Sequence, residues 1–268
     1  MKKLAIFMVA ILAFIGCGGE KSAKEESAQK KVVLKVGATP VPHAEILEFI
    51  KPDLAKEGID LQVVAFTDYV TPNVSLDDGS LDANFHQHKP FLDSLKKDRG
   101  LKLEPIANVH VEPIGLYSRK FKDINELPKG AIIGIPNDPS NAGRALLLLE
   151  AEGLITLKDS QNLHATELDI VENPKEIKIK PVEAALLPRT LDDVDAAIIN
   201  GNYALQAGLK SSDALILEGE KSPYANILVV QASRVNDENL LKLKEALCSP
   251  KVREFIKAKY HGEIVPVF

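Results

Sequence analysis

Residues 82–90 (DANFHQHKP) carry two histidines, His86 and His88, separated by a single residue. In a strand, side chains two residues apart point to the same face of the sheet. Two imidazoles at this spacing suit zinc, with His43 or an acidic residue completing the site. The alternative is that the histidines pack beside a ligand or satisfy backbone groups. Because no third metal ligand stands out, we expect no metal and keep zinc binding as an alternative.

A second polar segment, residues 137–144 (NDPSNAGR), leads into an apolar helical run. Ser140 or Asn141 is expected to cap this helix, which leaves free N–H groups at its start. Arg144 would then fall in the first turn, where the helix dipole disfavours a basic side chain. A ligand carboxylate would explain this arginine, since it could accept both the guanidinium fork and helix N–H groups. Pairing of Arg144 with a surface acid is the alternative.

No catalytic constellation accompanies these residues. The sequence contains no G-x-S-x-G, no phosphate-binding glycine loop and no H-E-x-x-H. The acid pairs Asp77-Asp78 and Asp192-Asp193 lie in polar contexts at predicted helix starts, where capping explains them. Cys248 lies in a helical stretch and is interpreted as a small buried hydrophobic residue. We therefore expect a binding protein without enzymatic activity or a cofactor.

The elements that must position the polar residues alternate between strand and helix, which implies α/β lobes with largely parallel sheets. A weak internal repeat, in which residues 71–84 resemble residues 187–197, favours two similar lobes. Open α/β sheets bind ligands at the carboxyl ends of their strands. Asn200 follows the apolar residues 196–199 at such an end, so its amide could bind a ligand or cap the next turn. The sequence thus predicts a shared cleft that closes about a hinge.

The N-terminal residues indicate export. A short basic region precedes an apolar run over residues 4–15, which ends at Gly16 and Cys17. The run is shorter than the about 20 residues of a membrane-spanning helix and is typical of a signal peptide. We expect removal of residues 1–16 and acylation of Cys17 as the new N-terminus. Residues 17–31 are polar and are predicted to be a flexible tether to the membrane.

Composition excludes several other classes of protein. Hydrophobic residues make up 45% and charged residues 26% of the chain, as in folded globular proteins. A formal net charge of −5 argues against a nucleic-acid partner. Two cysteines cannot form a disulfide scaffold. Aromatic residues make up only 5%, with no tryptophan, which disfavours a carbohydrate-stacking platform.

Five segments of the chain form a series of characteristic motifs: residues 66–73, 82–92, 136–149, 171–174 and 187–193. In this order they resemble the signature blocks of the NlpA-type lipoproteins, the methionine-binding components of ABC importers. The resemblance runs from about residue 32 to the C-terminus and includes the lipoprotein leader. It implies a two-lobed α/β periplasmic-binding-protein fold with a ligand cleft and a hinge between the lobes. The first lobe would comprise residues 32–117 plus 225–268, and the second residues 118–224.

The resemblance also implies a set of ligand-binding residues. Arg144 would clamp the carboxylate of methionine, and Asn141 and Asn200 would orient its polar end. Sulfur against aromatic rings contributes about 0.3–1.5 kcal/mol, which suits an aromatic wall for the thioether. Family members commonly carry phenylalanine where this chain has His86, which makes the wall smaller and more polar. The residues implied to form this wall are Tyr69, Phe85, His86, His88 and Tyr117.

The implied function is capture of methionine by lobe closure and delivery to an ABC permease and its ATPase. The protein would be anchored by lipid to a cell membrane and face the periplasm or the cell exterior. A methionine-containing dipeptide or another amino acid remains possible as the ligand. Two different functions compete with this one: a zinc-binding lipoprotein that uses His86 and His88, and a receptor or adhesion lipoprotein without a transport role.

Overall fold

The computed structural model describes residues 31–219 and 222–268. The predicted signal peptide, Cys17 and all but the last residue of the predicted tether lie outside these ranges. Within the described ranges, no helix is both long and apolar enough to cross a membrane.

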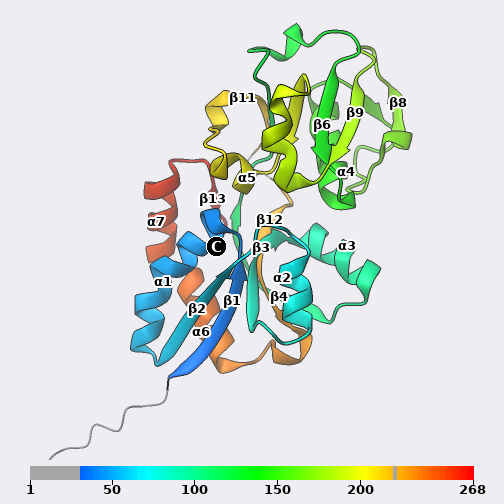
Figure 1. The fold of residues 1–268 in the computed structure, drawn as a ribbon. Coiled ribbons are helices and arrows are strands. Elements are labelled where there is room, and N and C mark those ends of the chain that lie inside the picture. The colour runs from blue at the N-terminus through cyan, green and yellow to red at the C-terminus, as the bar shows by residue number, and fades with distance from the viewer. Residues whose placement is uncertain (1–30, 220–221) are drawn as a thin grey trace, which may run out of the picture. The chain divides into compact units, whose positions relative to one another are not determined.

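The first lobe is built on a mixed sheet of six strands in the order β13-β4-β12-β3-β1-β2 (Figure 1). β1 pairs in parallel with β2 and β3, whereas β12 runs antiparallel to both β3 and β4. The strands are β1 (Val32–Ala38), β2 (Ile59–Ala65), β3 (Ala83–His88), β4 (Leu103–Val111), β12 (Ala225–Gln231) and β13 (Val265–Pro266).

The second lobe is built on a mixed sheet of five strands in the order β11-β5-β10-β6-β9. β6 is parallel to β10 and β9, and β5 is antiparallel to β10 and β11. A small antiparallel pair, β7 with β8, completes this part of the chain. The strands are β5 (Gly115–Tyr117), β6 (Ile132–Pro136), β7 (Thr156–Leu157), β8 (Ile170–Glu172), β9 (Lys178–Val182), β10 (Ala196–Ile199) and β11 (Ala214–Leu217).

The prediction of largely parallel sheets is therefore wrong. β5 and β12 enter their sheets directly from the other lobe and bring no crossover helix, and antiparallel pairing needs none. The predicted lobe boundary after residue 117 also differs from the structure, because β5 already pairs within the second sheet. The chain passes from the first sheet to the second over residues 112–114, between β4 and β5.

Helices cover both faces of the first sheet (Figure 1). β12 alternates in period 2: Leu228 packs with α1, α6 and α7, and Ile227 packs with α2 and α3 on the other face. Burial on both faces explains why the strand is a continuous apolar run. The α-helices are α1 (Glu45–Lys56), α2 (Thr71–Asp77), α3 (Lys89–Arg99), α4 (Pro139–Ala151), α5 (Gly201–Gln206), α6 (Glu238–Leu247) and α7 (Pro250–Tyr260).

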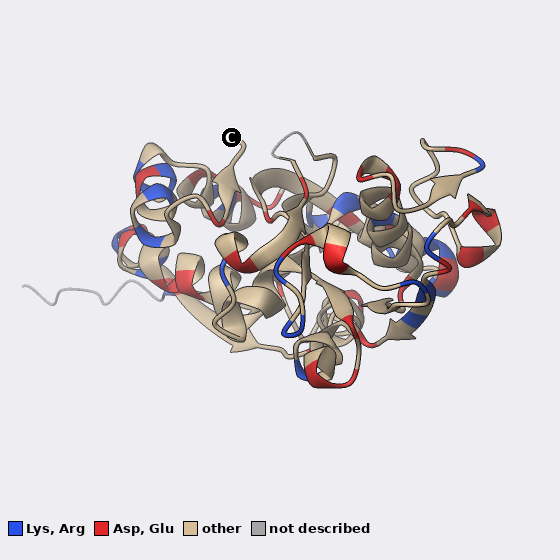
Figure 2. Ribbon diagram, turned by 90° about the horizontal axis from the view of Figure 1, so that it is seen from above, with Lys and Arg blue, Asp and Glu red and all other residues tan. Residues whose placement is uncertain are grey.

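Short helical turns connect these elements. One is a π-type turn, η1 (Pro40–Ala44), and the others are 3₁₀ helices. The 3₁₀ segments are η2 (Ile124–Glu126), η3 (Glu167–Asp169), η4 (Ala184–Asp192), η5 (Ser211–Asp213) and η6 (Ala232–Arg234). Acidic and basic residues are interspersed along the described chain (Figure 2).

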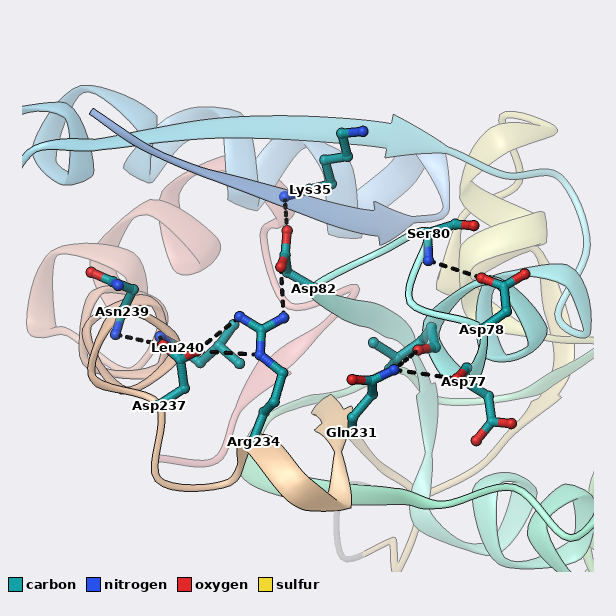
Figure 3. Close-up of polar contacts among 11 residues, drawn as sticks. Lys35, Asp77, Asp78, Ser80, Asp82, Gln231, Arg234, Asp237, Asn239 and Leu240 are labelled. Atoms are coloured by element: carbon teal, nitrogen blue, oxygen red, sulfur yellow. Dashed lines mark hydrogen bonds and ion pairs between the residues drawn. The ribbon is translucent and has the colours of Figure 1, made fainter. Parts of the chain in front are cut away.

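The two halves of the internal repeat make the same contacts. The carboxylate of Asp82, before β3, accepts a hydrogen bond from the Lys35 N–H at 2.8 Å. The backbone N–H of Asp82 donates to the Lys35 carbonyl, also at 2.8 Å. Asp195, before β10, does the same with Ile132, at 2.9 Å in both directions. In the first lobe, Arg234 also binds Asp82 at 2.6 Å (Figure 3). The repeated aspartate thus fixes the register of the strand that leads to each lobe's polar residues.

Gly143 lets α4 lie close to a neighbouring loop. A Cβ atom at this position would lie 2.3 Å from the Leu163 carbonyl oxygen, so only glycine fits without a shift. This contact holds the helix that carries Arg144 against the body of the second lobe.

Candidate functional site

A small cavity lies between the lobes, where strand ends from both sheets converge. His88 ends β3, Asn141 and Arg144 lie on the helix after β6, and Asn200 follows β10. This is the carboxyl-end location expected for ligands of open α/β sheets. The lining residues are Tyr69, His86, Gln87, His88, Phe91, Glu112, Asn141, Arg144, Asn200, Gly201, Asn202 and Asn226.

Two residues implied by the resemblance do not line this cavity. Phe85 lies in the core of the first lobe, with its ring centroid 4.7 Å from that of His43 and 5.4 Å from that of His110. Successive side chains of a strand point to opposite faces, so Phe85 cannot share the face of His86 and His88. Tyr117 packs in a core cluster of the second lobe. Their assignment to the thioether wall is corrected accordingly.

Arg144 lies in the second turn of α4, not the first. The helix begins at Pro139, and Asp138 caps it by accepting the Asn141 N–H at 2.9 Å. The predicted caps, Ser140 and Asn141, are therefore wrong, because proline lacks an N–H and is pre-organised for the first helical position. The shift places the guanidinium inside the protein, where its side chain is only 4% exposed.

Arg144 is held by three hydrogen bonds and by a cation–π contact with the ring of Tyr224. Nε donates to Glu218 Oε1 at 2.9 Å, Nη2 also contacts Glu218 Oε2, and Nη2 donates to the Glu112 carbonyl at 2.8 Å. The Tyr224 ring centroid lies 4.3 Å from the guanidinium carbon. The acid pairing that was the alternative to a ligand is thus present. Nη1, however, has no hydrogen-bond partner among the described residues and remains available to a ligand.

Asn141 connects the two lobes. Its Oδ1 accepts from Asn200 Nδ2 at 2.8 Å and from His88 Nε2 at 3.0 Å. His88 Nδ1 accepts the Phe91 N–H at 3.2 Å, so the His88 proton is on Nε2 and the ring is neutral. Burial, together with the charge of Arg144, lowers the pKa of His88 to about 3. Both nitrogens of His88 are therefore occupied.

His86 is buried, and neither ring nitrogen has a hydrogen-bond partner within the described structure. Burial and the neighbouring His43 and His88 lower its pKa well below the usual value. The described His and acid side chains with metal-like spacing are instead His43, His110 and Glu112. The geometry therefore does not favour zinc binding by His86 and His88.

Direct contacts also join the two lobes through Tyr69 and Tyr203. The Tyr69 hydroxyl, between β2 and α2, donates to Asn202 Oδ1 on α5. The Tyr203 hydroxyl, also on α5, donates to the Thr67 carbonyl at 3.0 Å. The rings of Tyr69 and Tyr203 lie 5.0 Å apart. These contacts stabilise the closed arrangement.

We expect Tyr203→Phe to weaken ligand binding about two- to tenfold, the equivalent of one net hydrogen bond of about 0.5–1.5 kcal/mol. Tyr203 does not line the cavity, so its effect should come from closure and should be equal for all ligands. Calorimetry measures the affinity, and X-ray scattering the closure. Tyr260→Phe is the matched control, since the Tyr260 hydroxyl contacts Glu45 within the first lobe. Equal loss in both variants would contradict the closure role.

Several residues that line the cavity were not predicted from the sequence. A signal existed for Glu112, because His110 and Glu112 alternate with apolar residues in a strand, which is unusual unless they face a polar site. Asn202 could have been suspected from its place two residues after Asn200. The other lining residues without a sequence prediction are Gln87, Phe91, Gly201 and Asn226.

Known proteins are similar to this chain in both sequence and structure. The model of the NlpA lipoprotein family matches residues 34–268. The D-methionine-binding lipoprotein MetQ of Escherichia coli (strain K12) is 42% identical, with 96% of this chain and 94% of the relative covered. The probable D-methionine-binding lipoprotein MetQ of Pasteurella multocida is 43% identical, with 96% and 95% covered.

A solved structure described as a nutrient-binding protein from Burkholderia cenocepacia bound to methionine is 48% identical to this chain. It superposes with a TM-score of 0.85, over 88% of this chain and all (100%) of that one. The predicted two-lobed α/β periplasmic-binding-protein fold is thereby confirmed. This chain belongs to the NlpA lipoprotein family.

Proposed function

We propose that this protein is an extracytoplasmic lipoprotein that captures methionine by lobe closure and delivers it to an ABC permease and its ATPase. The observation that carries the proposal is a cavity between the lobes that is bordered by buried Arg144, with its free Nη1, and by aromatic side chains. Relatives named for methionine binding, at 42% and 43% identity, support the choice of ligand.

In this proposal the methionine carboxylate binds Nη1 of Arg144, and Asn141 and Asn200 orient the polar end of the ligand. The thioether lies against Tyr69, His86 and His88. Membrane attachment through an acylated Cys17, after removal of residues 1–16, belongs to the same proposal. The protein performs no chemistry on its ligand.

The proposal is tested by native mass spectrometry of the full chain, purified in detergent without added ligand and then denatured to release what it holds. We expect a released species with the mass of methionine. A heavier species that contains methionine would keep the transport role and change the ligand to a dipeptide. Release of zinc alone would contradict the proposal.

One observation favours a second candidate ligand. The two unpartnered nitrogens of buried His86 lie in the cavity wall. A buried polar group without a partner costs about 1–3 kcal/mol, and a ligand side chain with a hydrogen-bonding group would recover part of this cost. Another amino acid of similar size, with a polar side chain, is therefore the second candidate, and the same mass measurement distinguishes it.

A further inference from the structure

Glu112 occupies the passage between the two sheets and lines the cavity. It is buried, with 5% of its surface exposed. Its Oε1 lies 2.7 Å from His110 Nε2 and 3.2 Å from His43 Nε2. Its Oε2 has no hydrogen-bond partner among the residues that the structure describes. One carboxylate oxygen is therefore fixed by the hydrogen bond with His110, next to the His43 ring, and the other is not used by any described residue.

The hydrogen bonds of His43 define its protonation. Its Nε2 faces two oxygens, Glu112 Oε1 and Asn226 Oδ1, the latter at 3.0 Å, so Nε2 must donate. Its Nδ1 lies 2.7 Å from the Thr39 hydroxyl, which can donate to it. His43 is thus a neutral donor, consistent with a pKa lowered to about 4 by burial.

His110 donates to the same carboxylate oxygen. Its Nε2 lies 2.7 Å from Glu112 Oε1, an oxygen that can only accept, so Nε2 carries the proton. Its Nδ1 is buried without a partner in the described structure. Oε1 therefore receives the hydrogen bond of His110, while the donor of His43 is used by Asn226.

Among the described residues, no lysine or arginine side chain pairs directly with the Glu112 carboxylate. Burial opposes the ionisation of Glu112, but the hydrogen bond from His110 and the nearby charge of Arg144 lower its pKa overall, so the carboxylate is charged. Arg144 is already paired with Glu218 and contacts Glu112 only through its backbone carbonyl. A buried carboxylate without a counter-ion is strongly unfavourable. A cationic group of the ligand, beside Oε2, would complete the site.

We propose that Glu112 binds the α-ammonium group of the ligand and that His110 is its positioning residue. The site then selects amino acids with a free α-amino group over deaminated or N-acylated analogues, including peptides with methionine at a later position. The placement fits the zwitterion: Arg144 donates to the Glu112 carbonyl at 2.8 Å, so the two charged residues border one end of the cavity. The inference rests on the proposed function and deepens it.

The test compares two ligands in calorimetry of the full chain in detergent: L-methionine and its α-hydroxy analogue, which lacks the ammonium group. We expect Glu112→Gln to lower the affinity for methionine by about tenfold or more and to reduce the preference for methionine over the analogue by a similar factor. The glutamine keeps the shape of the side chain, and its amide oxygen can still accept from His110 Nε2. N-acetyl-L-methionine should bind weakly to both proteins.

Two further variants separate positioning from general stability. Glu45→Gln, a half-buried glutamate of the same lobe that does not line the cavity, should leave the preference unchanged. His110→Phe keeps the aromatic packing and removes the donor to Oε1, so it should reduce the preference by about a fewfold, less than Glu112→Gln. Circular dichroism checks that each variant is folded.

An unchanged preference in folded Glu112→Gln would overturn the inference while leaving methionine binding, and the proposed function, intact. A preference unchanged by His110→Phe would overturn the positioning role. Loss of methionine affinity on EDTA treatment, restored by zinc, would assign His43, His110 and Glu112 to a metal instead. Failure of the unaltered protein to bind methionine would overturn the proposed function and this inference together.

Discussion

Arg144→Ala is expected to lower the affinity for methionine by about a hundredfold to a few thousandfold, with the fold retained. The reason is that a carboxylate buried in the closed cleft would lose its only cationic partner, and breaking a buried pair costs about 3–5 kcal/mol. Arg144 is 4% exposed, so water cannot replace the guanidinium at little cost. Calorimetry with L-methionine measures the change.

Arg119→Ala is the matched control, because Arg119 is exposed and pairs with exposed Asp192 at 2.6 Å. An exposed pair contributes little, about 0–1 kcal/mol, so this variant should bind normally. Arg144→Lys should fall between the two, since lysine keeps the charge but loses the fork that also engages Glu218. Methionine affinity unchanged in Arg144→Ala would remove Arg144 from the site.

Local periodicity predicted the part of the site that lies within one element. The spacing of His86 and His88 places both on the cavity side of β3, as a strand requires. The same alternation directs Phe85 into the core of the first lobe, so its implied place in the thioether wall was wrong. Asn200 was found from its position after a strand, because the carboxyl ends of parallel strands meet at one edge of the sheet.

Contacts between distant segments could not be predicted in this way. The partner of Arg144 is Glu218, 74 residues away, and that of His43 is Asn226, 183 residues away. Both pairings form because the chain returns to the two sheets through β11 and β12. The antiparallel pairing of these strands cannot be read from any local sequence pattern. The helix start at Pro139 was misplaced for a different reason: Asp138, Ser140 and Asn141 are all good caps, and only proline at the first position distinguishes them.

The buried histidines predict a steep loss of stability in mild acid. Burial lowers the pKa of His43 to about 4 and that of His88 to about 3, and it lowers the pKa of His86 well below its usual value. In the unfolded chain each histidine titrates near about 6.5. Their contribution is therefore complete above pH 6.5 and is lost as the pH falls towards 4, because only the unfolded state gains protons. Each such histidine costs about 1.4 kcal/mol per pH unit, so the group costs about 4 kcal/mol per unit. The loss of about 6 kcal/mol between pH 6.5 and pH 5 is a large part of a typical total of about 5–15 kcal/mol, so ligand-free protein should be strongly destabilised at pH 5.

Urea unfolding followed by circular dichroism, between pH 7.5 and 5 and without methionine, measures this slope. His88→Asn should reduce it by about 1.4 kcal/mol per pH unit, because asparagine still caps α3 but does not titrate. His164→Asn, at an exposed histidine, is the matched control and should keep the slope. The pKa of Glu112 is lowered, as are those of several other carboxylates. These groups change the stability only below their pKa in the unfolded chain, about 4, which is outside this pH range. A free energy of unfolding that stays constant from pH 7 to 5 would mean that the histidines beside the cavity become protonated without unfolding, and that the polar wall of the site is open to water.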